Sequence, residues 1–290
     1  MRIKLPLYFR TLMATVVLLT ANLSNATSDN ALSPRIVSAG SAITELLIML
    51  GAEQKLIAVD VTSEQPETAT LPKIGYHRQL SSEGLLALNP TMVIGSSEMG
   101  PKNVLEQLAS TGVSINVVNS DLSINGLLTR IDQIADLVQA QQQASQVKQN
   151  VQEQVDSLKK RHPANSEKKK VLFLLIHEGR PAKVAGADTT PDTLIALAGG
   201  TNPAAKQLSS YKQLSSESII NFQPDVILIS GRNSSEPSDI NNILQAMPLL
   251  KATPAGKNKQ IYPIDGQALI GGIGLKSLSE ATRINKLLYP

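Results

Sequence analysis

The sequence predicts an α/β protein of two doubly wound lobes, each a mostly parallel sheet with flanking helices, joined by one long rigid α-helix. Three observations lead to this fold. Short apolar segments alternate with helical segments in both halves of the chain, which is typical of parallel sheets covered by helices. A motif of the first half recurs in the second half. Between them, residues 123–161 contain no proline and, after Gly126, no glycine.

The first 26 residues have the pattern of a secretory signal peptide. Arg2, Lys4 and Arg10 precede an apolar run at 12–21, and small residues follow at 24–26. The apolar run is too short for a spanning helix. We therefore expect export to the periplasm, and no later segment is apolar for long enough to span a membrane.

The charge balance depends on this leader. It contains three of the 27 basic side chains and none of the 24 acidic ones, so the mature chain has 24 of each. A formally neutral chain gives no support for a nucleic-acid partner. The sequence also has no cysteine, so packing without disulfides must stabilise both lobes.

The first lobe is expected at residues 27–122 and the second at 163–290. Strands alternate with helices in each, and ligands of such sheets bind beyond the carboxyl ends of the strands. In the first lobe we expect strands at 36–38, 56–59, 92–94 and 114–118, with helices at 42–50, 82–88 and 104–110. In the second lobe we expect strands at 171–176, 226–229 and 261–264, with helices at 193–198, 240–247 and 275–288.

Residues 123–162 are expected to form the linker helix. Apolar residues recur there at helical spacing, among them Leu127, Ile131 and Ile134, then Val147, Val151 and Val155. About 35 residues at 1.5 Å each would make a helix roughly 50 Å long. A dimeric coiled coil is the alternative, but the apolar stripe drifts without sustained heptads. We expect an intramolecular strut in a monomer, with little closure of the lobes.

The repeated motif is Gln-Leu-Ser-Ser-Glu, at 79–83 and at 213–217. In both copies six residues, a proline and an apolar strand follow. Glu83 and Glu217 therefore lie in the first turn of a helix, where the helix dipole favours an acidic side chain. Only the first copy is preceded by Gly-Tyr-x-Arg, which marks Tyr76 and Arg78 as candidate ligand-binding residues.

These motifs resemble those of the substrate-binding proteins of iron-siderophore, cobalamin and haem importers. The Leu-x-x-Glu pattern followed by proline is similar across that superfamily. The run Gly-Tyr-His-Arg-Gln-Leu-Ser-Ser-Glu-Gly at 75–84 and the run at 185–200 resemble the haem-binding branch. The resemblance covers essentially the whole mature chain. It implies that the protein binds haem b as hemin between its lobes and delivers it to an inner-membrane ABC permease and its ATPase.

The chemistry of the candidates can be judged on the residues themselves. A phenolate is a hard anionic donor that suits ferric iron, and tyrosine is a known axial haem ligand. Arg78 would stabilise the phenolate or pair with a haem propionate. The alternative is a tyrosine packed over the lobe edge with Arg78 on the surface. His77 is expected to point away from Tyr76 in an extended loop.

Three further roles are predicted. His177 ends the strand at 171–176 and is a candidate second iron ligand, although a strand-end histidine bonded to backbone is the alternative. Arg232 follows the strand at 226–229 and is a candidate partner of a propionate. The resemblance implies that Glu83 and Glu217, one in each lobe, dock onto arginines of the permease.

Catalysis has little support, because the sequence has no Gly-x-Ser-x-Gly, no His-Glu-x-x-His, no phosphate loop and no cysteine. Three histidines also argue against a zinc or manganese importer. Two alternatives to haem binding remain. One is a ferric-siderophore or corrinoid cargo in the same fold, which three Phe, five Tyr and no Trp make less suitable. The other is an exported α/β enzyme.

Overall fold

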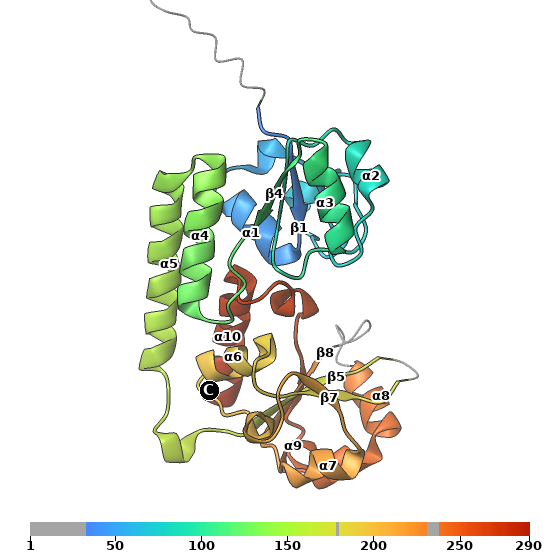
Figure 1. Cartoon of the computed structure of the whole chain (residues 1–290). Coiled ribbons are helices and arrows are strands. Elements are labelled where there is room, and N and C mark those ends of the chain that lie inside the picture. The colour runs from blue at the N-terminus through green and yellow to red at the C-terminus, as the bar shows by residue number, and fades with distance from the viewer. Residues whose placement is uncertain (1–32, 178–179, 231–237) are drawn as a thin grey trace, which may run out of the picture. The chain divides into compact units, whose positions relative to one another are not determined.

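The computed structural model describes residues 33–177, 180–230 and 238–290 (Figure 1). The signal peptide expected at 1–26 and the predicted propionate partner Arg232 lie outside the described residues. The described chain contains two sheets flanked by helices, and the predicted α/β class is confirmed. No helix of this described part is long and apolar enough to cross a membrane.

The first sheet is parallel throughout and has the strand order β2-β1-β3-β4. Its central strand β1 is buried along its whole length, as its unbroken run of apolar and small residues predicts. The strands are β1 (Ile36–Ala39), β2 (Leu56–Val59), β3 (Met92–Gly95) and β4 (Ser114–Val117), and the helices are α1 (Ser41–Met49), α2 (Ser82–Leu86) and α3 (Lys102–Ser110), with 3₁₀ turns at Glu53–Lys55 and Pro66–Thr68.

The second sheet has the order β7-β6-β5-β8-β9 and is mixed. Strands β5, β8 and β9 are parallel, whereas β6 and β7 run antiparallel to their neighbours. Its elements are β5 (Val171–Leu175), β6 (Lys183–Ala185), α6 (Thr190–Leu197), β7 (Tyr211–Gln213), α7 (Ser216–Asn221), β8 (Val226–Ser230), α8 (Ser238–Ala246), α9 (Pro254–Lys257), β9 (Ile261–Pro263) and α10 (Leu275–Leu288), with 3₁₀ turns at Asn165–Glu167, Pro203–Lys206, Pro248–Ala252 and Gly266–Leu269.

The prediction of one long linker helix is wrong. The segment forms two helices, α4 (Ile124–Val138) and α5 (Gln141–Lys160), which pack side by side (Figure 1). The break falls at Gln139, whose φ of 59° is left-handed, and Lys55 Nζ donates to the freed Val138 carbonyl at 2.7 Å. The lobe boundaries at 122 and 163 stay predictions.

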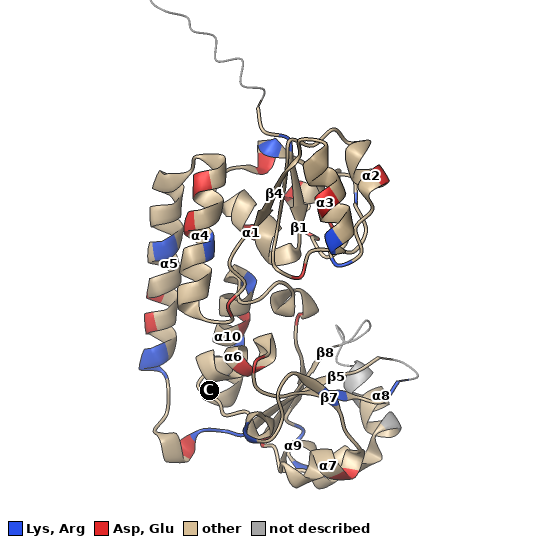
Figure 2. Ribbon diagram, in the orientation of Figure 1, with Lys and Arg blue, Asp and Glu red and all other residues tan. Residues whose placement is uncertain are grey.

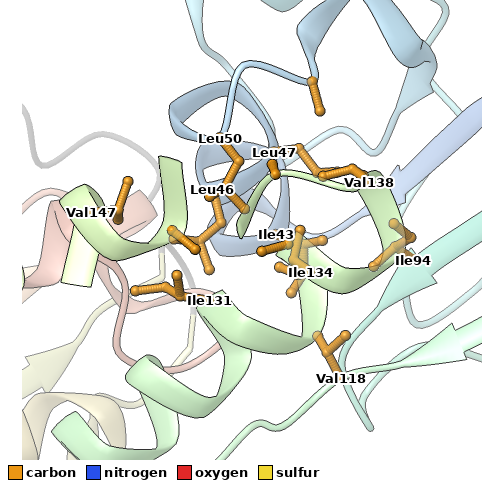
Figure 3. Close-up of a cluster of buried hydrophobic side chains, with 14 of the residues drawn as sticks. Ile43, Leu46, Leu47, Leu50, Ile94, Val118, Ile131, Ile134, Val138 and Val147 are labelled. Carbon is orange, nitrogen blue, oxygen red and sulfur yellow. The ribbon is translucent and has the colours of Figure 1, made fainter. Parts of the chain in front are cut away.

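Burial explains why the chain folds back here. In a straight helix, the apolar stripe of residues 144–155 would extend away from the first lobe. In the observed hairpin both stripes join one core, in which α1 faces α4 and α5 (Figure 3). Ile43, Leu46 and Leu47 of α1, and Leu50 just after its end, pack there with Ile131, Ile134, Val138 and Val147. The gain in buried apolar surface offsets the single left-handed residue, because burying one such side chain stabilises by about 1.5–3 kcal/mol.

The last helix, α10, connects the two lobes. It packs against α6 of the second lobe, against α5 and against α1 of the first lobe. The carboxylate of Glu45 in α1 accepts hydrogen bonds from the backbone N–H groups of Leu275 and Lys276, both at 2.9 Å. Burial raises the pKa of Glu45 to about 7, against these two hydrogen bonds, which lower it. Arg130 of α4, fully buried, donates to the carbonyls of Gly271 and Ile273 in the segment before α10.

Candidate functional site

The loop that carries Tyr76 is fixed through its backbone. Gly75 begins it with a φ of 81°, a left-handed conformation that favours glycine. Its carbonyl accepts from Val61 N–H at 2.9 Å, next to β2, and a tight turn follows in which Gln79 N–H donates to the Tyr76 carbonyl. His77 O and Leu80 N–H both bond Gly100. The loop is therefore attached at both ends to the segments that follow β2 and β3.

His77 anchors the same loop through its side chain. It is 1% exposed, and its Nδ1 lies 2.8 Å from Oδ2 of the fully buried Asp60. Thr62 and Ser63 also donate to Asp60. Burial opposes ionisation of both groups, yet the hydrogen bonds outweigh it, so that the pKa of Asp60 is lowered and the pKa of His77 is raised. The hydrogen bond between the two side chains therefore favours their charged forms and fixes both beneath the loop.

Tyr76 lies against His77, which contradicts the expectation that the two residues point apart. Their ring centroids are 4.5 Å apart with an angle of 56° between the planes. The reason is that the chain turns at Tyr76 instead of running extended. The tyrosine side chain is nevertheless 40% exposed, so the turn presents the phenol to solvent while its ring contacts the buried imidazole.

Arg78 follows at the far side of the turn. Its guanidinium pairs with the carboxylate of Glu98, in the segment after β3. The other carboxylate oxygen of Glu98 lies 3.8 Å from Nε2 of His77, which is too long for a hydrogen bond. The neighbouring imidazole of His77 and then the guanidinium of Arg78 lower the pKa of Glu98. Glu98 was not predicted, and its place after a sheet strand is the sequence signal that could have found it.

A cavity of about 430 Å³ opens beside these residues. Tyr76, Arg78 and Glu98 line it from the first lobe, and Asp188 and Tyr211 line it from the second. A cavity of this volume falls in the range of small-molecule sites. The segment 269–272 before α10 completes the lining. Two of the predicted site residues, Tyr76 and Arg78, are therefore brought together in one cavity.

Tyr211 lines the cavity and was not predicted as a site residue. It begins β7 and packs edge-on against Phe173, with ring centroids 6.4 Å apart. Burial raises the pKa of Tyr211 to about 12, and the charge of Glu98 adds to this effect while Arg78 opposes it. Tyr211 therefore remains a neutral phenol at physiological pH, suited to hydrogen bonding and ring contact.

The two remaining cargo candidates are His177 and Arg232. His177 lies two residues after the end of β5 and is exposed, but it is not one of the residues that line the cavity. Arg232 lies outside the described residues. The roles of both residues stay predictions.

Glu83 and Glu217 occupy equivalent places in the two lobes. Each is exposed in the first turn of a short helix, α2 or α7 (Figure 2). The preceding serine caps that helix in both cases, because Ser81 accepts from Gly84 N–H and Ser215 from Ser218 N–H. The two carboxylates are thus presented in the same way by two similar helices.

The arrangement is suited to holding a ligand. A half-exposed phenol beside a guanidinium supplies a hard oxygen donor and a counter-charge. Within the described residues no group of three or more His, Asp or Glu is placed to hold a bare metal ion.

Known proteins resemble this chain in sequence and in fold. The family model described as periplasmic binding protein matches residues 36–268. The crystal structure of the periplasmic haem-binding protein HutB of Vibrio cholerae is 57% identical in sequence, with a TM-score of 0.84 over 89% of this chain and 100% of that one. The periplasmic haem-binding protein RhuT of Roseiflexus sp. RS-1 is 32% identical, with a TM-score of 0.82 over 89% and 98%.

A curated relative has a different cargo. The vitamin B12-binding protein of Vibrio campbellii is 29% identical over 208 residues, which are 71% of this chain and 74% of that protein. Both relatives match this chain over most of its length. The chain belongs to the periplasmic binding protein family.

Proposed function

We propose that this protein binds haem as hemin in the cavity between its two lobes and delivers it to an inner-membrane ABC permease. The observation that carries the proposal is Tyr76, whose phenol is exposed in a cavity that also contains Arg78. Tyrosinate is an established axial ligand of ferric haem. The likeness to two solved haem-binding proteins at 57% and 32% identity supports the same cargo.

In this proposal Tyr76 ligates the iron from the first lobe. The porphyrin supplies four nitrogen ligands itself, in keeping with a site that contains no metal-binding cluster of its own among the described residues. His177 is the second axial ligand, and Arg78 and Arg232 pair with the propionates, since a guanidinium matches the geometry of a carboxylate. Tyr211 contacts the cargo from the opposite wall as a neutral phenol.

Transfer to the permease uses the two equivalent helices. Glu83 on α2 and Glu217 on α7 form a two-point contact with basic residues of the permease, one from each lobe. Such contacts orient two proteins and speed their association more than they strengthen the complex. In this proposal the leader at residues 1–26 directs the protein to the periplasm. The protein acts there as a monomer and has no enzymatic activity.

Corrinoid binding is the second candidate function. The likeness to a vitamin B12-binding protein supports it, at 29% identity. A corrinoid brings its own metal and axial ligands, so it would not need the Tyr76 phenol. The effect of removing this phenol therefore separates the two cargoes.

The test is a titration of the purified protein with hemin, followed by absorption spectroscopy. We expect a ferric tyrosinate-type spectrum in the wild type and its loss in Tyr76→Ala. Tyr262→Phe is the matched control, because Tyr262 lies in β9 with its hydroxyl bonded to Gln260. An unchanged spectrum of hemin with wild-type protein would refute the proposal. Tight binding of cyanocobalamin that survives Tyr76→Ala would establish the second candidate.

A further inference from the structure

One buried polar atom of the site has no partner. Nε2 of His77 is shielded from solvent, and the described residues supply no hydrogen bond to it. The other ring nitrogen is bound to Asp60, so the ring cannot turn to satisfy Nε2. Leaving a buried polar group unpaired costs about 1–3 kcal/mol. An unpaired atom at a functional site therefore calls for a physical reason.

The nearest candidate partner is Glu98, which is already engaged. One of its oxygens pairs with Arg78, and the other lies 3.8 Å from Nε2 of His77. A single carboxylate thus lies between the Arg78 guanidinium and the His77 imidazole and bonds only the guanidinium. The Arg78 and Glu98 side chains are 50% and 40% exposed, and ion pairs of this exposure are weak. A shift of less than 1 Å would bring Glu98 within hydrogen-bond distance of His77.

The charges around the cavity make this exchange relevant to cargo. Among its described lining residues, Arg78 is the cation, while Glu98 and Asp188 are carboxylates. An anionic ligand, such as a tyrosinate-bound porphyrin with propionates, must therefore attract Arg78 away from Glu98. The carboxylate that Arg78 leaves behind then needs another hydrogen-bond partner. Nε2 of the buried His77, which has no partner among the described residues and lies 3.8 Å from Glu98, is the atom in place to receive it.

We propose that Glu98 is a positioning residue that holds Arg78 in the empty site and transfers its hydrogen bond to Nε2 of His77 when an anionic cargo enters. The inference rests on the proposed function, since it assigns Arg78 to the cargo. It explains why Nε2 is unpaired in the ligand-free arrangement.

Two substitutions of Glu98 separate holding Arg78 from receiving His77. Glu98→Gln removes the charge that competes for Arg78 but keeps an oxygen that can accept from Nε2. Glu98→Ala removes both. We expect hemin to bind Glu98→Gln about two- to fivefold more tightly than the wild type, the size of a partly exposed ion pair. We expect Glu98→Ala to bind hemin at least about fivefold more weakly than Glu98→Gln, because His77 stays unpaired.

Glu106→Gln is the matched control. Glu106 pairs with Lys102 on the exposed face of α3, and its substitution should leave hemin affinity unchanged. Thermal unfolding of each variant shows whether the fold is kept. In a second background, His77→Phe, the difference between Glu98→Gln and Glu98→Ala should disappear, since phenylalanine has no ring nitrogen to bond residue 98. A crystal structure with hemin should show Glu98 bonded to His77 Nε2.

The outcomes distinguish this inference from the proposed function. Wild-type protein that fails to bind hemin overturns both. Wild-type protein that binds hemin, together with a Glu98→Gln variant of equal or weaker affinity, overturns only the role of Glu98. Equal affinities of Glu98→Gln and Glu98→Ala would do the same, as would a hemin-loaded structure that keeps the Arg78–Glu98 pair.

Discussion

The two copies of the repeated motif fold alike from Leu80 and Leu214 onward. A capping serine, a short helix and a buried apolar residue follow in each, Leu85 in α2 and Ile219 in α7. Even the turn before the strand is the same, because Asn89 and Gln223 have φ values of 47° and 44°. The strands that follow, β3 and β8, both pair in parallel with the central strand of their sheet.

The copies differ in the three residues ahead of this shared part. In the second lobe, residues 211–213 form strand β7 and bond to β6. In the first lobe, the equivalent residues 77–79 form a turn held by Gly100 and by the Asp60–His77 pair. Backbone that pairs in a sheet is tied to the plane of that sheet, whereas a turn anchored from below can direct Tyr76 and Arg78 into a cavity. The segment before the shared part thus extends a sheet in one lobe and forms the loop that carries Tyr76 and Arg78 in the other.

The largest expected effect is on hemin uptake, from the glutamate that both copies of the motif share. Replacing both Glu83 and Glu217 by Lys should abolish hemin uptake by cells, because it reverses the charge at both proposed contacts with the permease. Each single replacement should reduce uptake to a similar degree. Growth on hemin as the iron source measures this. Hemin binding by the purified double variant serves as the control, and uptake at the wild-type rate would refute the docking role.

The next largest effect is on hemin affinity, from Tyr76, which has no counterpart in the second copy of the motif. Tyr76→Phe removes only the phenol oxygen and should weaken hemin binding on the order of a thousandfold, about 4 kcal/mol. Tyr211→Phe removes the same atom from the opposite wall, where the phenol stays neutral, and should weaken binding by less than about tenfold. Titration with hemin measures both. Equal losses in the two variants would mean that the lobes contribute alike.

Asp60→Asn tests how the binding loop is supported. It leaves the buried His77 without its ionic partner and should lower the free energy of unfolding by roughly 4 kcal/mol. Ser209→Ala removes the hydrogen bond to Asp188 just before β7 and should cost about 1 kcal/mol or less, since sheet pairing holds that segment. Urea unfolding compares the two. A small loss in Asp60→Asn would show that backbone contacts alone fix the Tyr76 loop.

Glu45 joins α1 of the first lobe to α10 of the second, and its ionisation should make the stability of the protein depend on pH. Its folded-state pKa is raised from 4.5 to about 7, so the folded protein holds a proton that the unfolded chain releases above pH 4.5. Stability from this group is therefore present below pH 4.5 and falls as pH rises to about 7, by about 3 kcal/mol. Glu45→Gln should lack this decline. Unfolding by urea at pH 4.5 and 7.5 measures it, and parallel curves for both proteins would contradict the assignment.

The smallest effect returns to the shared part. Ser81→Ala and Ser215→Ala each remove a helix cap and should each cost about 1 kcal/mol. Their effects should add in the double variant, because the two helices belong to different sheets. Thermal unfolding of the three variants checks this. A clearly larger loss for one cap would show that the equivalent helices are not equally important to the fold.

The sequence predicted the elements with strong local signals. Alternating apolar and helical segments indicated both sheets, and the repeated motif located α2 and α7. The linker prediction was wrong because the left-handed turn at Gln139 has neither glycine nor proline, and only burial of both apolar stripes in one core requires it. The antiparallel β6 and β7 were also not foreseen, because three-residue strands have too little periodicity to recognise.

The candidate site shows the same limit. Tyr76 and Arg78 stand in a motif, so they were identified by it, and the structure brings them into one cavity. Glu98, Asp60 and Tyr211 come from segments without such a motif. Their importance depends on distances across the fold, such as the 2.8 Å contact between Asp60 and His77. Sequence alone found the residues that resemble a known pattern and missed those that support them.

The hold of Glu45 and Arg130 on the start of α10 has a consequence for how the chain is completed. A polypeptide is synthesised from its amino terminus. The face of α1 that contacts α10 therefore stays exposed until α10 has been synthesised and packs against it. Producing the two lobes as separate chains should therefore yield fragments that expose apolar surface and aggregate, because neither lobe folds independently. A tag placed after Pro290 would follow the helix that closes the molecule.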